Sequence, residues 1–259
     1  MRYFLHISYN GFDYRGWQKQ TGVTSVQEAL EFALSHILKL PISIVGCGRT
    51  DAQVHAIQFF AHFDSDLQWN FDLTYRLNQL LSHSIVVHDV IKVDGEPHAR
   101  FDVTTRTYDY YIHGEKNPFL NQFSYYFPFQ KLNFDKMKLA ASLLLKYQDF
   151  QSFCKTPEHN QTTICNLKES NLYVSDDGKQ IRFKITANRF LRGMIRVIVQ
   201  KLLDIGTGAI RVEEFENILI KNEPPNIKSI AAPYGLYLSK VTYPFLELKP
   251  AIQPPPLFL

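Results

Sequence analysis

One short segment combines residue types that can do chemistry. Residues 46–56 read GCGRTDAQVHA and lie between two expected strands. Two glycines let the backbone approach a ligand closely, and Arg49 and Asp51 follow with one residue between them. A catalytic carboxylate on a loop held by a rigid sheet is a common arrangement. On composition alone, however, a surface turn in which Asp51 makes a salt bridge is the simpler interpretation.

A strand and a helix carry further candidates. Tyr108 and Tyr110 share one face of an expected strand, so their spacing fits either a binding site or the core. Arg196 falls on a strongly apolar expected helix, where a buried guanidinium is costly unless it is paired. The alternative is an arginine at the edge of the helix that reaches solvent.

Four other residues lie near these segments. His55 follows Asp51 by four residues, which suggests acid–base work, but we favour a structural role. Trp17 could stack on a base or anchor its own loop. Arg189 and Arg192 are expected on the outer face of the helix that carries Arg196, where a charged surface is the simpler account.

The elements that must position these residues follow from periodicity and from turn and capping signals. Tyr3, Leu5, Ile7 and Tyr9 alternate with His6 and Ser8, which predicts a half-buried strand. A capping box at residues 25–28 opens a helix that Pro41 stops. The remaining expected strands are 42–47, 57–63, 85–93, 104–113, 163–174, 180–187 and 236–243, and the remaining expected helices are 71–81, 133–147, 189–204 and 211–221.

The order of these elements predicts an α+β fold made of two ferredoxin-like β-α-β-β-α-β halves. Residues 1–102 would carry the Asp51 loop, and residues 103–259 would carry Tyr108 and Arg196. Two such halves can join into a continuous, mostly antiparallel sheet with helices on one side, which removes exposed edges. The cleft between the halves is a natural place for a site. The tail 253–256, QPPP, cannot be helical.

Composition limits the class of protein. With 259 residues and 45% hydrophobic content, the chain can bury a sizeable core. A net charge of +3 fits a polyanionic partner without demanding one. The three cysteines, Cys47, Cys154 and Cys165, form no CxxC pair, which argues against a zinc site or a disulfide framework. No signal-peptide pattern or membrane-length apolar run is evident, so we expect a cytoplasmic protein with no membrane contact.

Several stretches of the chain, taken together, resemble one known family. Residues 46–56 are similar to the GRTDxGVHA signature of the bacterial tRNA pseudouridine synthase A family. Others resemble that family in the same order along the chain: 16–20 (GWQKQ), 25–28 (SVQE), 98–101 (HARF), 106–110 (RTYDY), 188–196 (NRFLRGMIR) and 232–238 (APYGLYL). The resemblance spans nearly the whole sequence, and several ordered motifs are far more specific than one.

The resemblance implies an isomerase that converts uridine to pseudouridine at positions 38, 39 and 40 of the tRNA anticodon arm. Asp51 aligns with the essential aspartate of the family, whose carboxylate attacks the target uridine so that the base detaches and rejoins through carbon 5. Nothing is oxidised, and no group passes between molecules. This is consistent with the absence of a P-loop, a dinucleotide-binding motif or a metal-ligand cluster from the sequence, and we expect no cofactor and no metal. The family works as a homodimer on tRNA.

The resemblance also assigns substrate-binding residues. Tyr108 aligns with the active-site tyrosine, whose ring can stack on an extruded uracil; for Tyr110 we keep the core interpretation. Arg49 would hold a phosphate or help to extrude the base, although a local salt bridge fits equally well. Arg196 would form a salt bridge with Asp51 and keep that carboxylate ionised.

Gln18 and Lys19 lie in a polar loop that could contact the RNA backbone or remain solvated.

Three places depart from the family pattern, among them 82–84 (SHS), which replaces a stretch that often contains proline and aspartate. Gln53 replaces a glycine, which would strain the loop if that position needs a positive φ. Asp109 stands where a basic residue is frequent, and its charge would weaken a phosphate contact. These departures leave an alternative open, a diverged paralogue that binds tRNA without turnover or modifies a different RNA. A small-molecule enzyme ranks last because no phosphate- or nucleotide-binding loop is evident.

Overall fold

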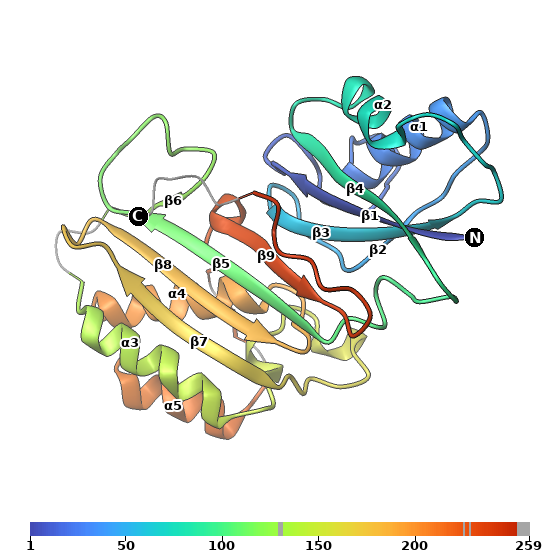
Figure 1. Ribbon diagram of the computed structural model, residues 1–259. Coiled ribbons are helices and arrows are strands. Elements are labelled where there is room, and N and C mark those ends of the chain that lie inside the picture. Colours follow the sequence, from blue (N-terminus) through green and yellow to red (C-terminus); the bar gives the residue numbers. More distant parts are fainter. Residues whose placement is uncertain (129–131, 225, 228, 253–259) are drawn as a thin grey trace. The chain divides into compact units, whose positions relative to one another are not determined.

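The chain forms two compact units (Figure 1). The computed structural model describes residues 1–128, 132–224, 226–227 and 229–252, so the tail 253–256 lies outside the described residues. Unit 1 comprises Met1–Thr104 with the segment that begins at Tyr237, and unit 2 comprises Thr105–Leu236. Both units combine mostly antiparallel strands with helices, which confirms the predicted α+β class. The division into 1–102 and 103–259, drawn from element order, stays a prediction.

Unit 1 has the ferredoxin-like order that the sequence predicts. Its elements are β1 (Arg2–Tyr9), α1 (Val26–Leu38), β2 (Val45–Gly46), β3 (His55–Asp64), α2 (Leu73–Leu80), β4 (Ile85–Val93) and β9 (Leu236–Thr242). Strand β1 pairs antiparallel with both β3 and β4, and β2 pairs antiparallel with β3. The carboxyl-terminal strand β9 pairs in parallel with the start of β3, where His55 lies opposite Tyr237. The Asp51 loop therefore leads directly into a central strand.

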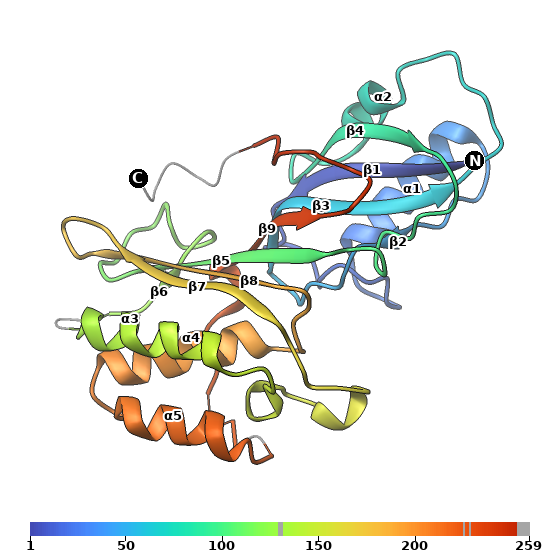
Figure 2. The same ribbon diagram turned by 60° about the horizontal axis from the view of Figure 1, so that its bottom comes forward.

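Unit 2 repeats this order over its first elements. They are β5 (Thr105–His113), β6 (Tyr125–Tyr126), α3 (Phe134–Leu143), β7 (Leu167–Val174), β8 (Gln180–Ala187), α4 (Met194–Gly206) and α5 (Val212–Lys221). Strand β8 lies between β5 and β7 and is antiparallel to both. Figure 2 shows α3, α4 and α5 on one side of these strands. Tyr108 lies on β5 and Arg196 on α4.

The strand predicted at the start of the chain is confirmed as β1, but it is buried on both faces, so the prediction that it is half-buried is wrong. Phe4, His6 and Ser8 are as inaccessible as the residues between them. The segment that follows β9 covers this second face: Tyr243 packs edge-on against Phe4, with ring centroids 5.6 Å apart. Periodicity within β1 could not reveal that its second face packs against a segment more than 200 residues away in the sequence.

The helix predicted at 189–204 begins five residues later. Gly193 has a left-handed backbone, with φ of 73°, and this interrupts the helical pattern before α4. Arg189 and Arg192 therefore precede α4 and do not lie on its outer face, which corrects that prediction. The N-cap half of the predicted capping box at 25–28 is confirmed, since the Ser25 side chain accepts a hydrogen bond from the backbone N–H of Glu28. Asn133 caps α3 in the same way, through the backbone N–H of Lys136.

Candidate active site

Asp51 opens a tight four-residue turn in unit 1. The N–H of Val54 donates to the carbonyl oxygen of Asp51 at 3.2 Å and closes the turn. Its third residue, Gln53, has a φ of 65°. A positive φ at that position is the hallmark of a type II turn, which favours glycine or asparagine. The position where the chain departs from the family thus needs the left-handed conformation, and glutamine is strained there.

The adjacent loop holds this turn through backbone hydrogen bonds. The N–H of Trp17 donates to the carbonyl of Thr50 at 3.1 Å, and the N–H of Gln53 donates to the carbonyl of Tyr14 at 3.2 Å. Gly16 lies between them with a φ of 91°, and a Cβ on it would sit 2.5 Å from the Thr50 carbonyl oxygen. Only glycine fits there. This role of Gly16 was not predicted from the sequence, although its place in the GWQKQ stretch is a signal.

Trp17 and His55 are structural anchors of the site. The buried Trp17 indole stacks on Phe59 with centroids 4.1 Å apart, and a Cβ on Gly46 would lie 2.5 Å from that indole. The buried His55 ring accepts the Gly11 N–H on Nδ1 at 3.1 Å and stacks on Tyr237. These contacts favour loop anchoring for Trp17 and confirm the structural role of His55.

The start of the turn and the residues just before it present two charged side chains to solvent. Arg49 and Asp51 are exposed, whereas Thr50 between them is buried and its hydroxyl lies 2.9 Å from that of Tyr9. The buried Thr50 fixes the backbone, while the Arg49 guanidinium and the Asp51 carboxylate on either side of it are exposed to solvent. Such an arrangement can bring a nucleophile and a phosphate-binding group to a substrate without moving the backbone.

Gln18 and Lys19 are exposed in the loop that precedes α1. The Lys19 ammonium lies 3.6 Å from the Glu31 carboxylate, and its backbone N–H donates to the Gln27 side chain at 3.2 Å. A local carboxylate therefore partly offsets the charge of Lys19.

In unit 2, the two strand tyrosines differ in environment. Tyr108 is half-buried and its ring lies edge-on to Phe190, with centroids 5.2 Å apart. Tyr110 is fully buried, and its hydroxyl donates to the carbonyl of Ala232 at 2.6 Å. Burial raises the pKa of Tyr110 well above its ordinary value, so it stays neutral. Tyr110 is thus a core residue, as predicted, and Tyr108 keeps an accessible ring.

Arg196 is half-buried near the start of α4 and bonds the segment that leads to β9. Its Nε donates to the carbonyl of Ala231 at 2.7 Å, and its own carbonyl accepts the N–H of Ala231 at 3.2 Å. Together with the Tyr110 bond to Ala232, this fixes the orientation of the guanidinium.

Asp109 does not face the same way as Tyr108. It points to the other face of β5, where it is buried and paired with Arg182 at 2.7 Å. Its charge is therefore neutralised within unit 2, and Asp109 is a structural ion pair.

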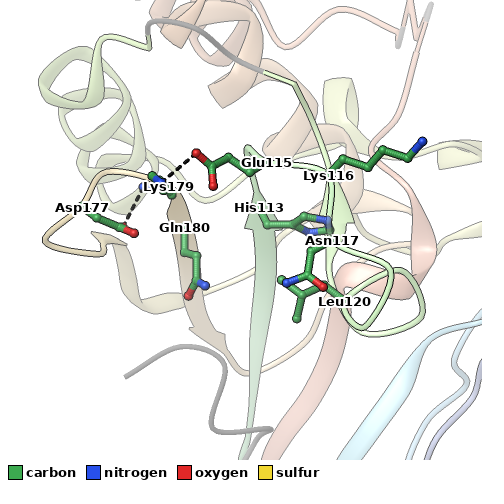
Figure 3. Close-up of a pocket in the computed structure, with 8 residues that line it drawn as sticks. All are labelled: His113, Glu115, Lys116, Asn117, Leu120, Asp177, Lys179 and Gln180. Atoms are coloured by element: carbon green, nitrogen blue, oxygen red, sulfur yellow. Dashed lines mark hydrogen bonds and ion pairs between the residues drawn. The ribbon is translucent and has the colours of Figure 1, made fainter.

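A cavity of about 210 Å³ lies at the far end of β5 and β8, and no predicted site residue lines it (Figure 3). Two of its lining residues, Lys179 and Glu115, form an ion pair of 2.8 Å, and a third, the buried His113, forms a hydrogen bond with Ser124. The cavity is lined by the turn between β7 and β8 and by the segment that follows β5.

The described residues contain no group of three or more His, Cys, Asp or Glu side chains placed to hold a metal ion. All three cysteines are buried thiols, and burial raises the pKa of Cys165 to about 11. Within the same residues, no helix has the length and apolar character needed to cross a membrane.

Comparison with known proteins places this chain in a class. Residues 140–244, which include Arg196, match the family model of the tRNA pseudouridine synthases. The tRNA pseudouridine synthase A of Porphyromonas gingivalis is 40% identical, over 94% of this chain and 97% of its own length. That of Shewanella halifaxensis is 39% identical over 100% of this chain and 99% of its own length. The chain belongs to the tRNA pseudouridine synthase A family.

Proposed function

We propose that this protein isomerises uridine to pseudouridine at positions 38, 39 and 40 of the tRNA anticodon arm. The observation that carries the proposal is a full-length similarity to tRNA pseudouridine synthases A together with a rigid turn that presents Asp51. The aspartate, the turn that holds it and the aromatic and basic groups of unit 2 are the parts that such a reaction needs.

In the proposed reaction, the Asp51 carboxylate attacks the target nucleotide and assists cleavage of the bond between N1 of uracil and C1′ of ribose. The detached uracil turns, and its C5 forms a new bond to C1′ as the Asp51 carboxylate is released unchanged. The proton on C5 then leaves and N1 gains one, so the product is an isomer of the substrate. No electron is gained or lost, and the reaction needs no cofactor.

The remaining site residues position the substrate. Tyr108 stacks on the extruded uracil, and its hydroxyl takes part in the proton transfer at C5. Arg49 holds a phosphate or assists extrusion of the base, while Gln18 and Lys19 contact the RNA backbone. Arg196, whose guanidinium is oriented by Ala231, pairs with Asp51 and keeps the carboxylate ionised.

The working form is a cytoplasmic homodimer, in which one tRNA leans across both subunits while one site acts on it. Sedimentation of the purified protein with and without tRNA tests this part separately from the chemistry.

The reaction is tested by incubating the purified protein with an unmodified tRNA transcript and no cofactor. Pseudouridine is then mapped by carbodiimide-dependent reverse-transcription stops. We expect stops in the 3′ half of the anticodon arm for the wild-type protein and none for Asp51→Ala, with tRNA binding retained. Asp66→Ala removes another exposed unit 1 carboxylate and should keep full activity. Full activity of Asp51→Ala would overturn the mechanism.

A further inference from the structure

A short loop after β4 displays an aromatic ring that the fold does not bury. Residues His98, Ala99, Arg100, Phe101 and Asp102 form this 98–102 loop. The Phe101 side chain is 75% exposed, although burying it would be favourable. Arg100 next to it is also exposed, and its guanidinium carbon lies 5.9 Å from the Phe101 ring centre.

The loop is rigid by its own hydrogen bonds. The Asp102 carboxylate accepts the N–H of His98 at 2.7 Å, and the N–H of Asp102 donates back to the His98 carbonyl at 3.1 Å. The His98 Nδ1 accepts the N–H groups of Arg100 and Phe101 at 3.0 and 3.3 Å. The His98 ring also stacks against the inner side of the Phe101 ring, with centroids 4.2 Å apart. The aromatic side chain is thus held in one orientation.

Buried side chains of unit 1 fix the loop from below. The N–H of Ala99 donates to Nδ1 of His62 at 3.1 Å, and the carbonyl of Ala99 accepts the hydroxyl of Tyr243 at 2.5 Å. Both His62 and Tyr243 are buried. Immediately before the loop, Arg2 donates to the carbonyls of Glu96 and Pro97 while it pairs with Asp64 at 2.8 Å. The loop is held by many hydrogen bonds and yet leaves its aromatic side chain exposed. This indicates that the exposed Phe101 ring has a function.

We propose that the 98–102 loop is a stacking platform for an unpaired nucleotide of the tRNA substrate. The base lies on the outer face of Phe101, and Arg100 bonds the adjacent phosphate. This inference rests on the proposed function for the identity of the RNA. A rigid aromatic ring beside a guanidinium is the combination that binds single-stranded nucleotides, because every base has a stacking face and every nucleotide a phosphate. A purely apolar protein partner would not require the arginine.

Steady-state kinetics with tRNA test the platform. Phe101→Ala should raise KM for tRNA about tenfold, within the range of one lost base stack, and leave kcat within about twofold. Phe101→Leu keeps an apolar side chain but no ring and should behave like Phe101→Ala, whereas Phe101→Trp should restore the wild-type KM. The matched control is Phe32→Ala. Phe32 is another unit 1 phenylalanine, 64% exposed and stacked on a histidine, His36, but it lies on α1. Phe32→Ala should change neither KM nor kcat.

A binding measurement separates this inference from the proposed reaction. In Phe101→Trp, added tRNA should quench indole emission, and in Phe32→Trp it should not. Arg100→Gln should lower the slope of log Kd against log salt by about one. Quenching without any pseudouridine formation would refute the proposed reaction and support the platform. A wild-type KM for Phe101→Ala, or an unquenched Phe101→Trp, would overturn the platform while the reaction could still stand.

Discussion

Replacing Gln53 with glycine is expected to stabilise the protein. Gln53 is the third residue of the Asp51 turn and has a φ of 65°. A side chain in the left-handed region costs roughly 1–2 kcal/mol through the clash of Cβ with the backbone. Glycine removes that cost but makes the unfolded chain more flexible, which offsets about 0.4–1 kcal/mol. The expected net gain in free energy of unfolding is therefore about 0.5–1 kcal/mol.

Urea unfolding of a small series measures this gain. The expected order of stability is Gln53→Gly, then Gln53→Asn, then the wild type together with Gln53→Ala, because alanine keeps the Cβ and asparagine tolerates the left-handed region. Lys39→Gly is a positive control, since Lys39 has a φ of 58° at the end of α1. Ala52→Gly, where φ is not positive, is the negative control and should destabilise. Gln53→Gly no more stable than Gln53→Ala would refute the account of strain.

Two further changes test the supports around the sites. Gly16→Ala should lower the free energy of unfolding by about 2 kcal/mol or more, since a Cβ there would lie 2.5 Å from the Thr50 carbonyl oxygen. It should also reduce pseudouridine formation. Urea unfolding and the mapping assay check the two effects, and a wild-type stability of Gly16→Ala would contradict the prediction. Burial lowers the pKa of His62 to about 4, so between pH 6.5 and 4 the unfolded chain binds a proton that the folded chain does not. Stability should therefore fall by at most about 3 kcal/mol as pH drops through this window, and less so in His62→Gln; an identical pH dependence in the two proteins would contradict it.

Much of the fold could be predicted because its signals are local. Alternation, capping and turn residues located most elements within a few residues, and the Ser25 cap of α1 was correct. The errors came from interactions that are distant in sequence or from single backbone conformations. The cover of β1 by Tyr243 is one case, and the left-handed Gly193, which delays α4, is the other.

Candidate site residues could be named from the sequence, and their roles stay predictions, but the contacts that hold them could not be foreseen. Motif resemblance pointed to Asp51, Tyr108 and Arg196, whereas only coordinates show what holds them. The pairing of Asp109 with Arg182 joins neighbouring strands, β5 and β8, whose register is not readable from composition. From the sequence alone, Asp109 is expected to repel RNA phosphates. In the structure, its carboxylate is neutralised by Arg182 and joins two strands of the sheet.

The support of the Asp51 turn explains why glutamine is tolerated where the family has glycine. The turn does not depend on its own sequence alone, because the adjacent loop holds it at two points: Trp17 bonds Thr50, and Tyr14 bonds Gln53. A strained residue persists where its surroundings over-determine the backbone. The departure at Gln53 therefore affects stability by about 1 kcal/mol and leaves the position of the carboxylate unchanged. It gives no reason to expect an inactive protein, and Gln53→Gly should gain stability without gaining activity.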